Sequence, residues 1–340
     1  FFIWLISFNN QADLRGLSLN WVFLNLIILL IPLIQGYWFL ILFPLDYYLK
    51  AKVFKQARER RKALKDLKVV AISGAYGKTS TKEILDQLLS TKFKVEKTLK
   101  NQNSNVSCAK RVLSLRDEID YFVCELGAYK IGDGSEICQF VRPQSSIITG
   151  LNHQHLSLFG SEENIISAES ESLKFLKPGN KAYLNWGSEM VRKINLIEGL
   201  DFVKYGAVED SDDFDASDFD IYAQNITYKN DLTTFDLITS KRTYTLTTNL
   251  FSKGNIENLV GVLAFCLDNG FKISDLQEKL LDIESPHGAL RLQETGYGAL
   301  IDDSYNANFD GVKNAMIALK KNAVDYDHKA VEYMDDKLDL

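Results

Sequence analysis

The sequence predicts an α/β protein joined to a membrane-spanning helix. From Val69 onward, short apolar runs that favour strands alternate with helical segments, an order typical of α/β folds. Before them, residues 16–45 contain no charged side chain. About 20 apolar helical residues cross a bilayer core of roughly 30 Å, so this stretch suffices for one tilted span. The two parts of the chain are therefore expected to occupy different environments.

Charge is distributed unevenly along the 340 residues. The net charge of -6 combines a net -1 in residues 1–49, nine Lys/Arg and two Asp/Glu in residues 50–68, and a net -12 in residues 69–340. An acidic body is a poor candidate for non-specific nucleic-acid binding, so we expect no nucleic-acid partner. The four cysteines form no C-x-x-C pair, and no H-E-x-x-H occurs. Reduced, buried thiols are expected, and a zinc protease is excluded.

The N-terminal segment is interpreted as a membrane region over residues 1–49, with its main span at about 19–43. A basic juxtamembrane linker, residues 50–68, follows it. By the positive-inside rule this linker lies in the cytoplasm beside anionic membrane lipid, which makes the rest of the chain cytoplasmic and membrane-anchored. The alternative is a buried core helix. Because the chain begins at Phe1 inside an apolar run, its natural start is expected further upstream.

A phosphate-binding turn is predicted after the first strand of the body. Residues 69–73 form a short buried strand, Gly74 to Gly77 form the turn, and a helix begins at about Thr79. Backbone N–H groups at the helix start, together with Lys78, are suited to hold ATP phosphates, and the Thr79 hydroxyl is suited to ligate Mg²⁺. The G-x-x-G-K-T spacing is shorter than the usual P-loop. An ordinary glycine turn is the alternative.

A second buried strand, residues 121–124, ends in Glu125. A carboxylate at the C-terminal end of a strand beside the phosphate strand is well placed for the same magnesium ion. Taken alone, Glu125 does not distinguish a metal ligand from an ordinary buried carboxylate.

Five motifs in order carry a resemblance to a known family. G-x-x-G-K-T is followed by N-x-N-x-N at 101–105, E-L-G-A at 125–128, N-x-x-H-L-x-x-F-G-S at 152–161 and D-D-S-Y-N-A-N at 302–308. This series resembles the Mur ligases, the ATP-dependent amino acid ligases of peptidoglycan precursor synthesis. The last motif is similar to the signature of the MurF branch, which adds D-alanyl-D-alanine. The similarity runs from about Lys68 to about Leu319.

The resemblance implies a fold and a domain organisation. The family's central ATPase domain has a mostly parallel sheet with helices on both faces and a small inserted antiparallel sheet, which the alternating residues 219–248 match. This domain is expected over residues 69–319. The family's usual N-terminal domain is replaced by the membrane segment and linker. Residues 320–340 do not resemble the first strand of its third domain, so the chain is expected to be a truncated, membrane-anchored variant.

The resemblance also implies a reaction. In the family, a substrate carboxylate takes the γ-phosphate of ATP to give an acyl phosphate, and the amine of an amino acid or dipeptide then displaces phosphate. ATP and Mg²⁺ are thus the expected cofactors. The expected partners are a peptidoglycan precursor peptide and an amino acid or D-Ala-D-Ala.

The roles carried over fall on residues that match the family's motifs. The implied phosphate loop comprises Gly74, Gly77, Lys78, Thr79 and Ser80. The implied magnesium ligands are Thr79, Glu125, His155 and Glu169, and the implied catalytic residues are Lys78, Glu125, His155 and Glu169. Asn258 matches the residue near adenine, Arg291 and Asp303 match those near the phosphates and ribose, and Asn101, Asn103 and Asn105 match those near the substrate and phosphate. The alternatives are a loop histidine at 155, a solvent-facing helix residue at 258 and an exposed charge at 291.

One departure concerns the second metal. Glu169 stands where the family usually has a lysine in A-K-x-E, whose carbamylated end bridges to the second magnesium ion. Glutamate supplies a carboxylate on a shorter arm, so a retained but altered site is expected.

Other functions remain open at this point. A non-catalytic ATP-binding membrane scaffold is the alternative from a different class, and other Mur-like ligases, such as folylpolyglutamate synthase, cyanophycin synthetase and MurT, are alternatives with different substrates. A P-loop transport ATPase is disfavoured because no Walker B run and no second ATPase motif follow.

Overall fold

The computed structural model describes residues 14–99, 102–153, 156–208, 215–229, 232–284, 291–295 and 298–302. The chain divides into two units, Phe1–Val53 and Phe54–Leu340. The division falls inside the stretch predicted as a linker. Helix α1 (Leu14–Ala63) contains the boundary, so its first part belongs to one unit and its last residues to the other.

The described part of the first unit is a long apolar helix, as the uncharged segment predicts. Its large hydrophobic side chains are exposed, among them Trp21, Leu33 and Leu40. The helix is long and apolar enough to cross a membrane. An 18-residue stretch of it has a mean hydropathy of 2.4, and none of that stretch is buried. That exposure does not fit a buried core helix. By length and composition, this segment is a candidate membrane span.

The second unit is built on one large, mostly parallel sheet. In the described residues the sheet has nine strands in the order β2-β3-β1-β4-β5-β6-β7-β8-β9. Their bounds are β1 Lys68–Ser73, β2 Val95–Lys97, β3 Tyr121–Glu125, β4 Ser145–Ile148, β5 Lys181–Asn185, β6 Asp201–Ala207, β7 Ile221–Lys229, β8 Leu232–Thr239 and β9 Thr243–Thr248. Every pair from β2 to β7 is parallel. The near-continuous burial of β1, β3 and β4 is typical of parallel strands covered on both faces.

The far end of the sheet is antiparallel. Strand β8 pairs antiparallel with β7 and with β9, which confirms the small antiparallel part expected over residues 219–248. Along β7 buried side chains alternate with half-buried ones at the start, and exposed side chains alternate with half-buried ones from Asn225 onward, so the two faces of the strand differ in exposure. Strands β10 (Arg291–Thr295) and β11 (Gly298–Asp302) pair with each other as a separate antiparallel sheet.

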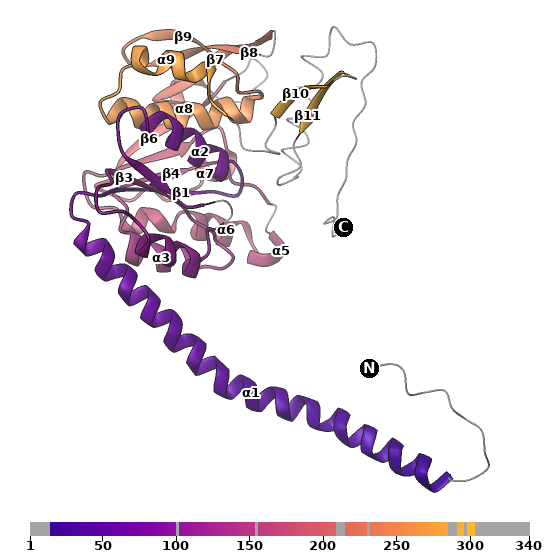
Figure 1. Ribbon diagram of the computed structural model, residues 1–340. Coiled ribbons are helices and arrows are strands. Elements are labelled where there is room, and N and C mark those ends of the chain that lie inside the picture. The colour runs from indigo at the N-terminus through magenta and orange to yellow at the C-terminus, as the bar shows by residue number, and fades with distance from the viewer. Residues whose placement is uncertain are drawn as a thin grey trace. The chain divides into compact units, whose positions relative to one another are not determined.

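Helices cover both faces of the sheet. Figure 1 shows α2, α8 and α9 on one side of the strands and α3 and α6 on the other. The helices of the second unit are α2 Lys78–Leu89, α3 Asn105–Leu113, α4 Asp133–Val141, α5 Leu156–Phe159, α6 Glu162–Glu169, α7 Glu189–Arg192, α8 Lys253–Asp268 and α9 Ile273–Leu281, with 3-10 turns η2 Glu171–Phe175 and η3 Ala216–Asp218. This arrangement is the α/β architecture that the sequence predicts.

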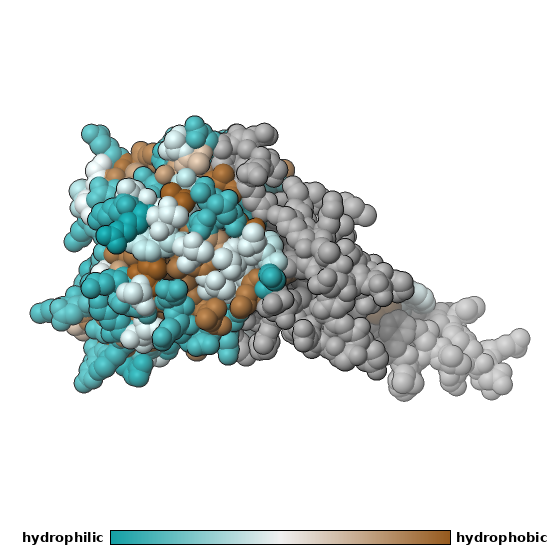
Figure 2. Space-filling model, turned by 90° about the horizontal axis from the view of Figure 1, so that it is seen from above, coloured by the Kyte–Doolittle hydropathy of each residue, from teal (hydrophilic) through white to brown (hydrophobic). Residues whose placement is uncertain are grey.

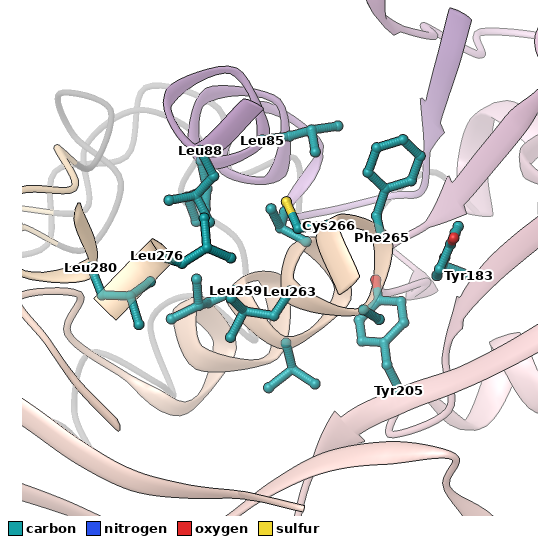
Figure 3. Packing of buried hydrophobic residues seen from close by; sticks show 14 of the residues in the cluster. Leu85, Leu88, Tyr183, Tyr205, Leu259, Leu263, Phe265, Cys266, Leu276 and Leu280 are labelled. Atoms are coloured by element: carbon teal, nitrogen blue, oxygen red, sulfur yellow. The ribbon is translucent and has the colours of Figure 1, made fainter. Parts of the chain in front are cut away.

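The core beneath α8 fixes the helix that carries the phosphate turn. Leu85 and Leu88 of α2 are fully buried in one hydrophobic cluster with Leu259 and Leu263 of α8 (Figure 3). These leucines recur at the three- and four-residue spacing that places side chains on one helix face. Tyr205 of β6 lies in the same cluster and donates a hydrogen bond to the Ile148 carbonyl of β4 at 3.1 Å. Helix α2 is therefore anchored along its length.

The last residues of α1 pack within the second unit. The rings of Phe54 and Phe140 stack with centroids 5.5 Å apart. The buried Arg61 guanidinium donates to the carbonyls of Val141, Leu64 and Leu67 at 2.8–2.9 Å. Backbone carbonyls at a helix end lack intrahelical partners, so an arginine can satisfy them there. Seen from above, the described part of this unit presents a mostly hydrophilic face with scattered apolar residues (Figure 2).

The four cysteines are free and buried, as predicted from their spacing. Burial raises the pKa of the Cys138 and Cys266 thiols well above the ordinary value. The pKa of Cys124 is also raised, by its contact with Cys108 and by burial. A raised pKa leaves little thiolate at neutral pH, and the thiolate is the reactive form.

We therefore expect the native protein to react slowly with a thiol reagent such as 5,5′-dithiobis(2-nitrobenzoate) at pH 7.5, and the urea-unfolded protein to release the equivalent of all four thiols at once. The absorbance of the released thionitrobenzoate measures both rates. Rapid labelling of the folded chain would contradict the buried positions of these side chains.

Candidate functional site

The glycine turn predicted to bind phosphate lies at the carboxyl end of the central strand. It connects β1 directly to α2, and β1 sits between β3 and β4. The chain moves from β1 to one side of the sheet for β2 and β3, then crosses to the other side for β4 and β5. Such a reversal of strand order opens a crevice at the carboxyl ends of the strands, where α/β proteins bind ligands. The turn is therefore at the favoured position in this sheet.

The turn needs glycine at two positions. Gly77 precedes α2 with φ of 80°, and Gly74 has φ of 138°, both in the region that favours glycine. A Cβ on Gly74 would lie 2.1 Å from the Thr149 hydroxyl oxygen, and one on Gly77 would lie 2.6 Å from Asn258 Oδ1. Close packing and backbone conformation together exclude side chains here.

The end of β4 holds the turn in place. The backbone N–H groups of Ala75 and Tyr76 donate to the Gly150 carbonyl at 2.9 and 3.2 Å. The Thr149 hydroxyl donates to the Tyr76 carbonyl at 2.5 Å. The turn is thus a fixed loop, suited to preorganised contacts with an anion.

Two polar side chains of the site stand at the start of α2. Lys78 and Thr79, the first residues of the helix, are both half-buried. The Lys78 ammonium donates to the Gly74 carbonyl within its own loop. The Thr79 hydroxyl lies 3.3 and 3.2 Å from the two carboxylate oxygens of Glu125. Ser80, the next residue, is buried at 8% exposure.

Glu125 reaches Thr79 because the two strands are neighbours. Strand β3 pairs parallel with β1 in a register that places Ile72 beside Glu125, so the strand predicted to lie beside the phosphate strand does so. The Glu125 carboxylate is 2% exposed and accepts a hydrogen bond from Asn103 Nδ2 at 3.2 Å. It also pairs with the Lys82 ammonium at 2.8 Å.

Lys82 is a polar residue of the site that sequence reasoning missed. In the sequence it reads as an ordinary helix lysine, although it stands four residues after Lys78 and so lies one turn along the same face. That spacing is the signal that locates it.

Glu169 lies directly on the phosphate turn. Its Oε2 accepts hydrogen bonds from the Ser73 hydroxyl at 2.6 Å and the Gly74 backbone N–H at 2.8 Å, and the side chain is only 1% exposed. Two residues further on, Glu171 accepts from the backbone N–H groups of Gly132 and Ser135 near the start of α4. These two carboxylates connect the end of α6 to the turn and to α4.

Asn258 of α8 faces the turn. The side chain is 6% exposed and lies against Gly77, so the interpretation as a solvent-facing residue is wrong. Asn105 begins α3 and donates to Glu136 of α4. The structure therefore brings Asn103, Asn258 and Glu169 to the loop–Glu125 region, while the described contact of Asn105 is with α4.

Several predicted residues lie outside the described residues: Asn101, His155 and Asp303. The backbone of Arg291 pairs with Asp302 in the β10–β11 hairpin, and its side chain is not described. The neighbouring His153 lies 2.9 Å from Glu162. Hydrogen bonds from Lys193 and from His153 lower the pKa of Glu162 below its ordinary value.

The sequence that forms this site and most of the described sheet matches a known protein family. The model of the Mur ligase middle domain matches residues 72–266, more than half of the chain. The chain belongs to the Mur ligase middle-domain family. Its members are ATP-dependent amide ligases, and an ATP-binding role for this domain follows from membership.

Relatives within the Mur ligases are distant but cover most of the chain. The UDP-N-acetylmuramoyl-tripeptide–D-alanyl-D-alanine ligase of Escherichia coli is 27% identical over 261 residues, which is 74% of this chain and 55% of that protein. The same ligase of Rickettsia prowazekii is 28% identical over 266 residues, 78% of this chain and 57% of that protein. The chain spans a little over half of the length of these relatives.

Solved structures agree on the fold. MurF from Acinetobacter baumannii superposes with a TM-score of 0.71 at 25% identity, covering 80% of this chain and 58% of that one. MurF from Thermotoga maritima, solved in complex with ADP, gives a TM-score of 0.68 at 24% identity, covering 79% of this chain and 61% of that one. These structures confirm the α/β middle-domain architecture that the sequence predicts.

The side chains at this Mur ligase site can be tested for their fit to magnesium. Among the described residues, no three or more His, Cys, Asp or Glu side chains form a cluster that could hold a metal ion by themselves. Thr79 and Glu125 offer a hydroxyl and a carboxylate side by side. Mg²⁺ is usually held by one or two carboxylates plus substrate phosphates and water rather than by an all-protein cage. The donor set thus fits magnesium bound together with a nucleotide.

The contacts of Glu169 generate a stability prediction. Glu169→Ala removes the acceptor for Ser73 and Gly74 and leaves two buried donors unsatisfied, a change that costs about 1–3 kcal/mol per donor. We expect urea unfolding to show this loss.

Glu169→Gln is the matched control, because its amide oxygen can still accept from both donors, and it should retain most of the stability. Equal losses in the two variants would contradict the acceptor role of this carboxylate.

Proposed function

We propose that the chain is the nucleotide-binding part of a MurF-like ligase, which uses Mg·ATP to join a muramyl peptide to an amino acid or D-Ala-D-Ala. The proposal is supported by the names of the relatives, which specify a muramoyl-tripeptide and D-alanyl-D-alanine as what those proteins join. It is a proposal about the whole reaction, whereas membership of the family concerns the middle domain.

The observation that carries the proposal is the contact between Thr79 and Glu125 beside a glycine loop bearing Lys78. A loop at a helix start presents N–H groups to phosphate, the lysine adds a positive point charge, and the hydroxyl–carboxylate pair offers magnesium ligands. These groups come from the turn after β1, the start of α2 and the end of β3. An ordinary glycine turn would not need a buried carboxylate at its edge.

The proposed roles follow from position. Gly74, Gly77, Lys78, Thr79 and Ser80 bind the triphosphate, and Asn258 lies beside the loop on the side proposed for adenine. Thr79 and Glu125 are the proposed ligands of one magnesium ion. Glu169, which accepts hydrogen bonds from Ser73 and Gly74 at the loop, is proposed to lie near a second magnesium ion. Other proposed roles rest on the resemblance of motifs alone, namely those of His155, Arg291, Asp303 and Asn101. The roles proposed for Asn103 and Asn105 rest on their motif and also on contacts, of Asn103 with Glu125 and of Asn105 with Glu136.

The proposed chemistry is phosphoryl transfer followed by amide formation. An oxygen of the substrate carboxylate attacks the γ-phosphorus of ATP, and ADP leaves. The amine nitrogen of the second substrate then attacks the acyl carbon. The bond between the acyl carbon and the phosphate oxygen breaks, phosphate leaves with its electron pair, and the amine loses a proton. Both steps depend on positioning and on neutralising charge near the phosphates, which is what Lys78 and the loop N–H groups provide. Magnesium, when bound, neutralises phosphate oxygens.

We also propose that α1 anchors the chain in a membrane with the ligase unit on the cytoplasmic side. The uncharged residues 16–45 and the basic residues that follow support this orientation. In this proposal residues 1–49 form the membrane region, 50–68 the basic juxtamembrane stretch and 69–319 the ATP-binding domain.

The function is tested by measuring phosphate release by the full-length protein with Mg·ATP. We expect release to require both a muramyl tripeptide and D-Ala-D-Ala, because acyl transfer completes only when the amine arrives. Release that ignores both substrates would contradict ligation of this pair. ATP binding without any release would favour the non-catalytic scaffold instead.

Lys78→Ala should lower phosphate release by about a hundredfold or more, the usual effect of losing one preorganised electrostatic contact. The control is Lys94→Ala, which removes an exposed lysine whose described ion pair is with the exposed Glu118, and which should leave turnover unchanged. Retained turnover in Lys78→Ala would contradict the assignment of the loop.

The membrane proposal predicts that the protein stays in the membrane fraction after extraction with alkaline carbonate. Placing two aspartates within the apolar stretch, as in Leu29→Asp with Leu33→Asp, should release it, because a charged residue at the bilayer centre is strongly unfavourable. Matched Leu29→Ala with Leu33→Ala should remain membrane-bound. Release of the unaltered protein by carbonate would contradict a spanning helix.

A further inference from the structure

The described part of the site contains an ion pair that is almost completely buried. The Lys82 ammonium lies 2.8 Å from Glu125 Oε2, and the two side chains are 0% and 3% exposed. Removing two charges from water is costly, and a buried ion survives only when it is paired and hydrogen-bonded. The loss of either partner would leave the other as an uncompensated buried charge.

Lys82 and Thr79 meet the same carboxylate. They stand three residues apart on α2, a spacing that places both on one face of the helix. Thr79 contacts both oxygens of Glu125, Lys82 contacts Oε2, and Asn103 donates to Oε1. Glu125 is therefore held by three side chains, two from α2 and one from the loop before α3. Thr79 is half-buried, whereas Glu125 and Lys82 are buried.

A second lysine, which contacts α2 from a neighbouring strand, gives a matched comparison. Lys97 of β2 pairs with Asp86 at 2.6 Å and also with Glu83, the carboxylate that lies 3.7 Å from Lys82. Lys97 thus belongs to the same chain of charges. The ion pairs described for the Lys97 side chain are with α2, whereas those of Lys82 include Glu125.

We propose that Lys82 is a positioning residue that sets the order of metal binding. Its ammonium neutralises Glu125 and holds it toward Thr79, and the same positive charge opposes a divalent cation at the Thr79–Glu125 pair. Negative phosphates supplied by the nucleotide outweigh that repulsion. The cation therefore enters with the nucleotide and binds weakly without it.

This inference rests on the proposed function, because it concerns the cation that would accompany ATP. Its own content is the charge of Lys82, which acts on metal binding in the absence of any nucleotide. Coulomb interactions over a few ångströms inside a protein are large enough to change a binding constant by about tenfold or more per unit charge.

The test compares Lys82→Met with Lys97→Met in the full chain, purified in detergent micelles. Methionine is unbranched and close to lysine in length, so it fills the same space without the charge. Mn²⁺, which shares the preference of Mg²⁺ for oxygen ligands, is titrated without nucleotide, and its paramagnetic resonance signal reports the free ion. Melting temperature is measured in parallel, in EDTA and in Mg²⁺.

We expect Lys82→Met to bind Mn²⁺ about tenfold or more tightly than the unaltered protein, whereas Lys97→Met binds it as weakly as before. In EDTA, Lys82→Met should melt roughly 5–10 °C lower, because Glu125 is then buried without its counter-ion. Mg²⁺ should restore most of that loss in Lys82→Met and change the other two proteins little.

Unchanged Mn²⁺ affinity in Lys82→Met, or a melting temperature that Mg²⁺ does not restore, would overturn the inference. If Lys82→Met does not fold in EDTA, refolding in Mg²⁺ gives the same answer: recovery supports the inference, and no recovery overturns it. The double variant Lys82→Met with Glu125→Gln should lose the magnesium response, because the carboxylate is gone.

The two proposals fail separately. If the unaltered protein does not bind Mg·ATP, the proposed function fails, whatever Lys82→Met does. If the unaltered protein binds Mg·ATP and Lys82→Met shows no gain in Mn²⁺ affinity without nucleotide, only the inference about Lys82 fails.

Discussion

The parallel pairing of β1 with β3 and β4 is the constraint on which the site depends. It places Glu125 beside the glycine loop on one side and Thr149 and Gly150 beside it on the other. The register with β3 decides which side chain meets Thr79, because a shift of one residue would turn Glu125 to the opposite face. The large core under α8 then holds α2 against these strands. The side chains that surround the loop are thus determined by the pairing of strands that are far apart in the sequence.

Burial divides the polar groups of this region into two kinds. Glu125, Lys82 and Glu169 are almost wholly inaccessible, and each has partners that compensate its charge or satisfy its hydrogen bonds. Lys78 and Thr79 are half-buried and lie at the mouth of the loop. A ligand would therefore meet the first turn of α2 directly, while the buried set acts on it through position and charge.

Much of the fold was predictable from sequence, and the site less so. Three sequence patterns predicted the correct type of element: the strand–glycine–helix order, the alternation after residue 68 and the β-rich stretch near residues 219–248. They did so because periodicity and turn residues are local signals. Contacts between distant segments are not local. The partnership of Lys82 with Glu125 joins residues 43 positions apart, and only strand pairing reveals it. Asn258 was interpretable as solvent-facing for the same reason, since its neighbour Gly77 is far away in sequence.

The arginines of the basic stretch have a consequence for what that stretch can recognise. Arg58 donates to Gln139, Arg60 to Asp117 and Leu115, and Arg61 to three backbone carbonyls, so their planar guanidinium groups are committed within the second unit. The exposed cations left there are lysines, such as Lys52 and Lys55. A surface opposite this stretch would meet compact, strongly hydrated ammonium groups, which attract negative charge without selecting its geometry.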